Sequence, residues 1–169
     1  MAIIHELRTF ASSPNMFLVT QVVTISSVGI FAGTAFNYNK VIMPSLRKFS
    51  SASSLAVWAE MFACATPMQI SSVVVSSLGG SILYYRTRNP YYLAGAAMMA
   101  SIVPYTATLL YPINNKLLDI RKHGHDDPHV ESMLTQWDTL HFGRTLMSLG
   151  ALAVTVYAAL RGQEIRIEL

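Results

Sequence analysis

Residues 91–111, YYLAGAAMMASIVPYTATLLY, contain no Lys, Arg, Asp or Glu. A helix needs about 20 residues to cross the hydrocarbon layer of a bilayer, so this run is long enough to span it. Tyr91 and Tyr92 stand at one end and Tyr111 at the other, as aromatic residues do at the two membrane interfaces. The stretch predicts a transmembrane helix, which we expect over residues 90–111.

Three other stretches share this apolar character. The first lies between Arg8 and Lys40 and the second is uncharged from Met61 to Tyr85, whereas the last is uncharged only after Arg144. Each predicts one more membrane-spanning helix. The expected helices cover residues 15–38, 55–85, 90–111 and 138–160, with a polar loop at 112–137. The sequence therefore predicts an all-α, four-transmembrane-helix bundle, an integral membrane protein with a single membrane domain over residues 1–169.

The composition agrees with a lipid environment. Of the 169 residues, 52% are hydrophobic and 12% are charged, whereas soluble domains carry about 25% charged residues. The net charge of +3 comes from scattered basic residues, so we expect no nucleic-acid partner. The amino-terminal segment has neither the order of a cleavable secretory signal nor the Arg- and Ser-rich composition of mitochondrial targeting, so the endoplasmic reticulum is the expected membrane in a eukaryotic host. Membrane orientation stays open.

Small residues predict close helix packing. Gly29 and Gly33 form a small-xxx-small pattern in the first apolar stretch, and such patterns let two helices approach closely. Packing within the bundle explains the pattern, and so does an oligomer interface. An oligomer through Gly29 and Gly33 is therefore possible but not specified.

Charged residues open the last apolar stretch, in WDTLHFGRT at residues 137–145. On a helix, Trp137, His141, Arg144 and Ser148 fall on one stripe. An ionisable group inside a membrane costs about 3 kcal/mol even on lenient scales, and such groups usually face the bundle interior or a polar site. The stripe predicts a site. The alternative is that Arg144 extends to the head groups and Trp137 belongs to the aromatic belt.

A second polar group lies at the end of the third apolar stretch, in PYTATLLYPINNKL at residues 104–117. Asn114 and Asn115 fall on the membrane side where the His141 stripe begins, because one loop joins the two helices, and the hydroxyl of Thr106 precedes them. A shared pocket is therefore allowed, although Asn-Asn is also ordinary turn chemistry. Glu60 starts its helix on the same side, where it can join the site or lie in water among the head groups.

Metal binding is an alternative use of these residues. The segment RKHGHDDPH at 121–129 holds His123, His125 and His129. Its spacing matches no closed zinc pattern, so a solvated loop is the simpler interpretation. A copper or iron site would combine His141 with Glu60 or with one of the three loop histidines, although a single histidine makes a poor metal site.

Two of these stretches carry a resemblance to a known family. PYTATLLYPINNKL followed by WDTLHFGRT resembles the Pro-Tyr-Thr, Pro-x-Asn and Trp-x-x-x-His-x-x-Arg motifs of the anthrone oxygenase-like family of small four-helix membrane proteins. The likeness is concentrated in residues 104–150, with NKVIMPSL at 39–46 as a weaker match in the first half. Carried over residue by residue, it selects Pro104, Tyr105, Thr106, Pro112, Asn114, Asn115, Trp137, His141 and Arg144.

The resemblance implies an oxidoreductase, a monooxygenase of polyketide secondary metabolism that oxidises a hydrophobic anthrone-like or phenolic substrate with dioxygen to a quinone. His141 would be the base, since an imidazole titrates near neutral pH. Arg144 with Asn114, Asn115 and Tyr105 would stabilise the anion, and Trp137 would help to form the slot. We expect Thr106, Glu60 and Ser148 to contact substrate. No cofactor beyond dioxygen is expected, with copper or iron as the alternative.

A non-catalytic role explains the same residues differently. The protein would then be a membrane subunit or a small carrier, and the His141, Arg144 and Asn115 side chains would form a structural network between helices. A structural network predicts that loss of His141 lowers stability, whereas a catalytic base predicts a folded protein without turnover.

Overall fold

A computed structural model describes residues 14–124 and 127–167, with side chains described up to residue 161. Four helical segments, each 32–37 residues long, are long and apolar enough to cross a membrane, and no strand occurs in the described ranges. The first is α2 (Pro14–Asn37) followed by the π-helical turn η1 (Tyr38–Ile42) and α3 (Met43–Leu46). The second is α4 (Ser51–Thr87), the third is α5 (Pro90–Tyr105), η2 (Thr106–Leu110) and α6 (Tyr111–His123), and the fourth is α7 (Val130–Ile167). The fold is the expected four-helix membrane bundle.

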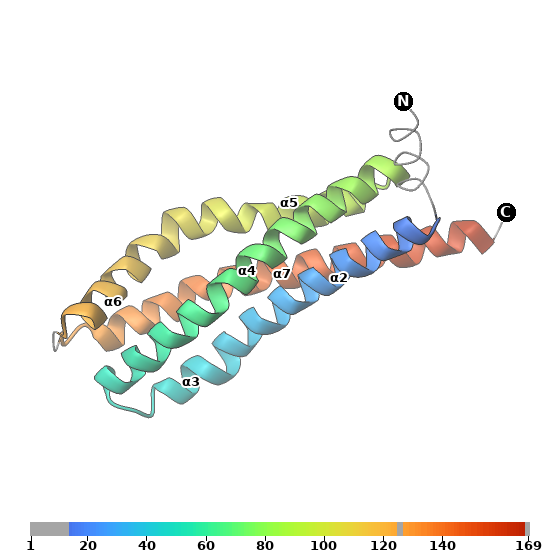
Figure 1. Ribbon diagram of the computed structural model, residues 1–169. Coiled ribbons are helices and arrows are strands. Elements are labelled where there is room, and N and C mark those ends of the chain that lie inside the picture. Colours follow the sequence, from blue (N-terminus) through green and yellow to red (C-terminus); the bar gives the residue numbers. More distant parts are fainter. Residues whose placement is uncertain (1–13, 125–126, 168–169) are drawn as a thin grey trace.

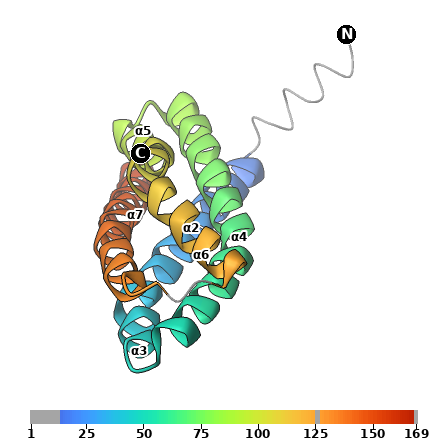
Figure 2. The same ribbon diagram turned by 90° about the vertical axis from the view of Figure 1, so that its left-hand side faces the viewer.

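The four segments form a square in which α2 and α5 each lie between α4 and α7. The start of α2 and the end of α7 lie at one end of the bundle, together with the turn from α4 to α5 (Figure 1). The short α3 and the helix α6 lie at the opposite end, where α6 crosses beside α4 in the end-on view (Figure 2). The polar residues discussed below come from η1, the middle of α4, the η2–α6 segment and the first half of α7.

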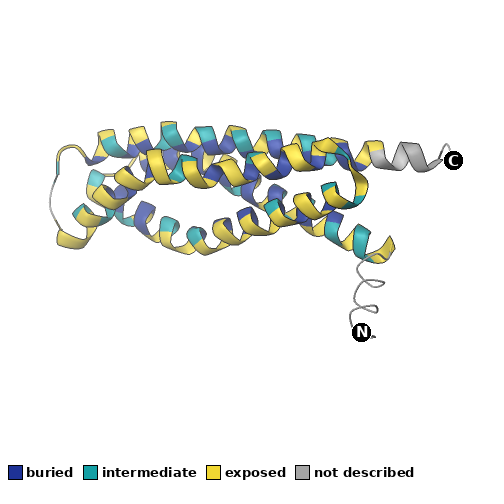
Figure 3. Ribbon diagram, turned by 90° about the horizontal axis from the view of Figure 1, so that it is seen from above, coloured by how far each residue is buried: buried dark blue, intermediate teal, exposed yellow. Residues whose placement is uncertain are grey.

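Burial follows a membrane pattern. Buried positions line the inner faces of the helices, and exposed positions cover the outside (Figure 3). Many outward side chains are large and apolar, for example Leu18, Ile30, Leu78 and Leu146, each more than half exposed. A surface of this kind is stable in a hydrocarbon solvent and not in water.

The helices extend beyond the ranges predicted from hydropathy. The most marked difference is in residues 112–137, predicted as a polar loop, of which 112–123 belong to α6 and 130–137 to α7. The reason is packing, because Ile113 and Leu117 of α6 and Leu134 of α7 bury in one cluster around Trp58. Hydropathy marks where a helix is in lipid, whereas backbone hydrogen bonds and packing decide where it ends.

The two π-helical turns adjoin proline residues. Met43 donates its backbone N–H to the carbonyl of Tyr38 just before Pro44, and Tyr111 donates to Thr106 just before Pro112. A proline has no N–H for the usual bond to the carbonyl four residues earlier, and a wider turn accommodates this defect. The turns carry Asn39 and Thr106, which both belong to the candidate site described in the next subsection.

The two glycines of the first span differ in their surroundings. A Cβ built on Gly29 would only just reach Leu152 of α7, at 4.0 Å, whereas nothing lies within 4 Å of one built on the exposed Gly33. An oligomer through these glycines stays a prediction.

Candidate functional site

The site is built on the inward face of α7. Trp137, His141, Arg144 and Ser148 are all buried, and His141 is 1% exposed. Their spacing gives one stripe along the helix, as the periodicity of a helix requires. The buried stripe faces α2, α4 and α6 through the contacts described below.

Aromatic rings enclose His141. The indole of Trp137 stacks on the imidazole with 4.5 Å between ring centroids and 21° between planes. Tyr38 lies on another side, with its ring centroid at 5.5 Å, and Trp58 packs edge-on against Trp137. The buried imidazole therefore packs against two aromatic rings, and the stacked indole restricts its rotation.

Among the described residues, one ring nitrogen of His141 has a hydrogen-bond partner and the other has none. Nδ1 lies 3.2 Å from the side-chain oxygen of Asn39 in η1. Nε2 is buried and has no hydrogen-bond partner among the described residues. A buried ring nitrogen without a partner is costly in a structural core, and it is the condition that a base needs.

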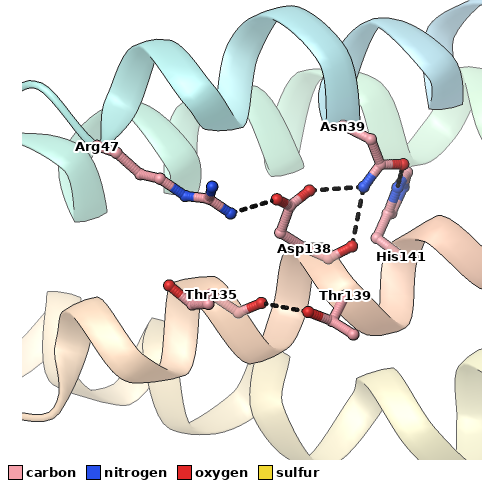
Figure 4. Close-up of polar contacts among 6 residues, drawn as sticks. All are labelled: Asn39, Arg47, Thr135, Asp138, Thr139 and His141. Atoms are coloured by element: carbon pink, nitrogen blue, oxygen red, sulfur yellow. Dashed lines mark hydrogen bonds and ion pairs between the residues drawn. The ribbon is translucent and has the colours of Figure 1, made fainter.

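Asn39 belongs to a chain of polar contacts that reaches the surface. Its amide nitrogen donates to the backbone oxygen of Asp138 at 2.8 Å and to the Asp138 carboxylate at 2.6 Å. The other carboxylate oxygen of Asp138 pairs with Arg47 at 2.7 Å, as Figure 4 shows. Thr145 donates its hydroxyl to the same Asn39 oxygen at 2.6 Å.

Arg144 is a buried cation, 8% exposed. Its guanidinium donates to the side-chain oxygen of Gln69 on α4 at 2.7 Å and lies over the ring of Phe31 at 5.2 Å. Within the described residues it forms no ion pair with a carboxylate, and its Nε has no hydrogen-bond partner. In the described part of the chain its hydrogen-bond partner is a neutral amide, and a desolvated cation in this setting is well placed to attract an anion.

A cavity of about 640 Å³ lies beside Arg144, between α4 and the α5–η2–α6 segment. Its volume is within the range of small-molecule sites. Arg144 is the single charged residue among those that line it, and most of the wall is apolar. The lining residues are Phe31, Phe62, Thr66, Gln69, Ile70, Val73, Val74, Ile102, Val103, Thr106, Ala107, Tyr111, Asn114 and Arg144. Ile70, Val74 and Val103 are also among the outward, exposed side chains, so the cavity adjoins the lipid-facing surface.

Some of the residues predicted from the third span line the cavity, and others form hydrogen bonds between helices. Asn114 is buried, lines the cavity and accepts a hydrogen bond from the indole N–H of Trp137 at 2.8 Å. Thr106 lines the cavity, and its hydroxyl has no partner among the described residues. Tyr105 donates its hydroxyl to the backbone oxygen of Leu140 at 2.8 Å.

Several other predicted site residues lie elsewhere. Ser148 is buried but donates to the backbone oxygen of Thr145 on its own helix. Asn115 and Glu60 are exposed and do not line the cavity. Asn115 differs from Asn114 because neighbouring helical residues point about 100° apart.

The histidines named for the metal alternative do not form a cluster in the described residues. His123 pairs with Asp119 at 3.1 Å on the exposed face of α6, and His129 is exposed. His125 lies outside the described residues. No group of three or more His, Cys, Asp or Glu side chains that could hold a metal ion occurs among residues 14–124 and 127–161.

Sequence reasoning did not select Asn39, Gln69 or Gly143 for the site. Asn39 and Gln69 are buried amides, one near the end of the first span and one inside the second. The cost of burying an unpaired polar group in a membrane is the signal that marks them. Gly143 is marked by its place between His141 and Arg144. A Cβ built there would meet the hydroxyl of Tyr105, so glycine allows α5 and α7 to approach at the site.

Comparison with known proteins agrees with the motifs. The model of the family described as anthrone oxygenase matches residues 33–154, which include both π-helical turns and the whole buried stripe. Searches of curated proteins and of solved structures gave no match. Because the family model covers most of the chain, this protein belongs to the anthrone oxygenase family.

Proposed function

We propose that the protein is a membrane-embedded monooxygenase that converts a hydrophobic anthrone-like or phenolic polyketide to a quinone with dioxygen. The observation that carries the proposal is the apolar cavity whose wall holds one buried cation, Arg144. A flat aromatic substrate fits an apolar wall, and its enolate or phenolate oxygen fits the guanidinium. Family membership supports oxygenase chemistry in general.

The polar part of the wall suits one developing oxygen anion. Arg144 supplies charge, and Gln69 holds its guanidinium in place through the side-chain oxygen. The amide nitrogen of Gln69 and the hydroxyl of Thr106 have no partners among the described residues. In our proposal these donors bind substrate oxygens. A buried donor without a partner is costly, so a ligand that supplies the missing acceptor binds more tightly.

His141 accepts the proton in this proposal. An anthrone is a carbon acid, and loss of a proton from its central methylene gives an electron-rich anion that reacts with dioxygen. Nε2 is free to accept, but His141 does not itself line the cavity. The proposal therefore requires the substrate to displace side chains at the inner wall by enough to reach Nε2, one helical turn from Arg144.

The overall reaction balances without a further reductant. The methylene loses two hydrogens and gains one oxygen atom from dioxygen, and the other oxygen atom leaves as water. The substrate supplies all the electrons, so we propose a cofactor-free reaction, with copper or iron as the alternative. The bundle excludes water from the anion. We further propose that the substrate arrives through the bilayer and that the protein lies in the endoplasmic reticulum in a eukaryotic host.

Oxygen uptake and quinone formation test the proposal. The purified protein in lipid nanodiscs receives emodin anthrone, beside a His141→Gln variant and a chelated sample. We expect turnover above the spontaneous rate, a loss of about 10²–10⁴-fold in His141→Gln, and no loss with chelator. Activity that chelator abolishes and one metal restores would favour the copper or iron alternative.

A second test examines the cavity itself. Val74 lines the cavity and Leu78, one turn further along α4, does not. Val74→Trp should raise KM by occupying substrate space, whereas Leu78→Trp, on the same lipid-facing helix, should not. Equal effects of the two variants would show that this cavity does not bind the substrate.

The alternative of a non-catalytic subunit or carrier has its own signature. Contacts such as Arg144 with Gln69 join different helices and would stabilise a protein of either kind. If His141→Gln lowers thermal stability and no anthrone or phenol is oxidised above background, the structural role is the better interpretation.

A further inference from the structure

We propose that Asn39 is a positioning residue that holds His141 in the tautomer with the proton on Nδ1 and the lone pair on Nε2. This inference rests on the proposed role of His141 as the base. Asn39 lies in η1 and is 8% exposed. It contacts His141 from a different helix, and the two residues are 102 positions apart in the sequence.

The orientation of the Asn39 amide follows from its partners. One end of the amide lies 2.8 Å from the backbone oxygen of Asp138 and 2.6 Å from its carboxylate. A backbone oxygen can only accept a hydrogen bond, so this end must be the nitrogen. The opposite orientation would place an amide oxygen against two acceptors. The oxygen of Asn39 therefore faces His141.

The tautomer of His141 follows in turn. The Asn39 oxygen has no proton to give, so at 3.2 Å it can pair with Nδ1 only if Nδ1 carries one. A neutral imidazole carries a single ring proton, and Nε2 is then left with its lone pair. That atom is the one without a partner. The amide thus does for this histidine what a carboxylate does in other general-base sites.

The support for Asn39 extends to the membrane edge. Asp138, which fixes the amide, is itself held by Arg47, whose side chain is 49% exposed. Figure 4 shows the order of contacts from Arg47 through Asp138 and Asn39 to His141. Trp137 stacks on a face of the imidazole and restricts the rotation of the ring. The amide sets which nitrogen is protonated, and the indole sets the ring plane.

Nitrogen NMR tests the tautomer directly. The protein with ¹⁵N-labelled histidine rings is placed in nanodiscs at about pH 8, where an ordinary imidazole is neutral, and His141→Gln identifies the His141 signals. We expect a protonated Nδ1 and a bare Nε2. A proton on Nε2, or on both nitrogens, overturns the proposal. This wild-type spectrum is decisive even if a variant does not fold.

Two variants separate positioning from general packing. Asn39→Leu removes the oxygen and should give a mixture of tautomers. Thr145→Val is the matched control, because it removes the other donor to the same oxygen and should leave Nδ1 protonated. A folded Asn39→Leu protein with the wild-type tautomer also overturns the proposal.

Kinetics supply the readout that a structural role would not give. Asn39 does not line the cavity, so Asn39→Leu should lower kcat by about 10²-fold or more, as wrong tautomers do, with little change in KM. The NMR measurement needs no substrate. If the spectra agree and no substrate is oxidised, the proposed function fails and the tautomer assignment stands, so the two failures can be told apart.

Discussion

The guanidinium of Arg144 on α7 donates a hydrogen bond of 2.7 Å to the side-chain oxygen of Gln69 on α4. These two helices lie diagonally across the bundle, so this contact joins elements that otherwise touch little. Both residues are more than 90% buried and both line the cavity. The contact therefore joins two helices of the bundle and also holds the guanidinium in the proposed oxygen-binding wall.

Replacing Gln69 should affect stability through the cation that it leaves behind. Gln69→Leu removes the acceptor while Arg144 stays buried, and a hydrogen bond to a charged group contributes about 1.5–3 kcal/mol. We expect a loss of that size in the free energy of unfolding, measured by denaturant titration in mixed micelles. Gln69→Glu keeps an acceptor and is the control. A Gln69→Leu protein as stable as wild type would contradict this role.

Trp137 and Asn114 should behave as a coupled pair. Asn114→Leu leaves the buried indole N–H without its acceptor, and Trp137→Phe leaves the Asn114 oxygen without its donor, at about 1–3 kcal/mol each. The double variant should cost less than the sum, because both partners are then apolar. A double-mutant cycle on unfolding free energies checks this. Strict additivity would mean that the hydrogen bond contributes nothing.

The helices could be predicted from the sequence because hydropathy reports the solvent. Residues 91–111 have to be helical in lipid, where every backbone group needs a partner inside its own segment. The ends were not predictable in the same way. Residues 112–123 are polar enough to leave the membrane but remain helical because Ile113 and Leu117 pack around Trp58, and the packing partner is not visible in a local pattern.

The site was predictable only as separate local patterns, the stripe on α7 and the residues Thr106 and Asn114 of the third span, which line the cavity. A period of 3.6 residues places Trp137, His141 and Arg144 on one stripe, and all three are buried. The hydrogen-bond partners come from other helices. Asn39 is 102 residues from His141 in the sequence, and Gln69 is 75 residues from Arg144. Such pairs depend on how the spans are arranged and on the wide turn η1, neither of which hydropathy specifies.

The ion pair between Arg47 and Asp138 should contribute little to stability. The Arg47 side chain is 49% exposed, although that of Asp138 is only 13% exposed, and an ion pair whose cation is open to solvent contributes at most about 1 kcal/mol. Arg47→Gln should therefore lower the free energy of unfolding by less than this, and by still less in high salt. Unfolding measured at low and high ionic strength tests both points. A loss of several kcal/mol would show that Arg47 supports the buried amide far more strongly than its exposure suggests.

Gly143 should be intolerant of even one methyl group. A Cβ at this position would meet the hydroxyl of Tyr105 and approach Cζ to 2.8 Å, so Tyr105 would have to leave the backbone oxygen of Leu140 to which it donates. Overpacking of this kind costs about 1–3 kcal/mol, which Gly143→Ala should show as a lower unfolding free energy.

The matched comparison for this prediction uses Gly33, which is exposed and has no atom within 4 Å of a built Cβ. Gly33→Ala should be neutral or slightly stabilising, because alanine favours a helix by about 1 kcal/mol over glycine. Tyr105→Leu removes the ring, so adding it to Gly143→Ala should restore most of the unfolding free energy that Gly143→Ala loses. If Gly143→Ala is as stable as Gly33→Ala, α5 and α7 are not held at the close approach that places Tyr105 beside the His141 turn.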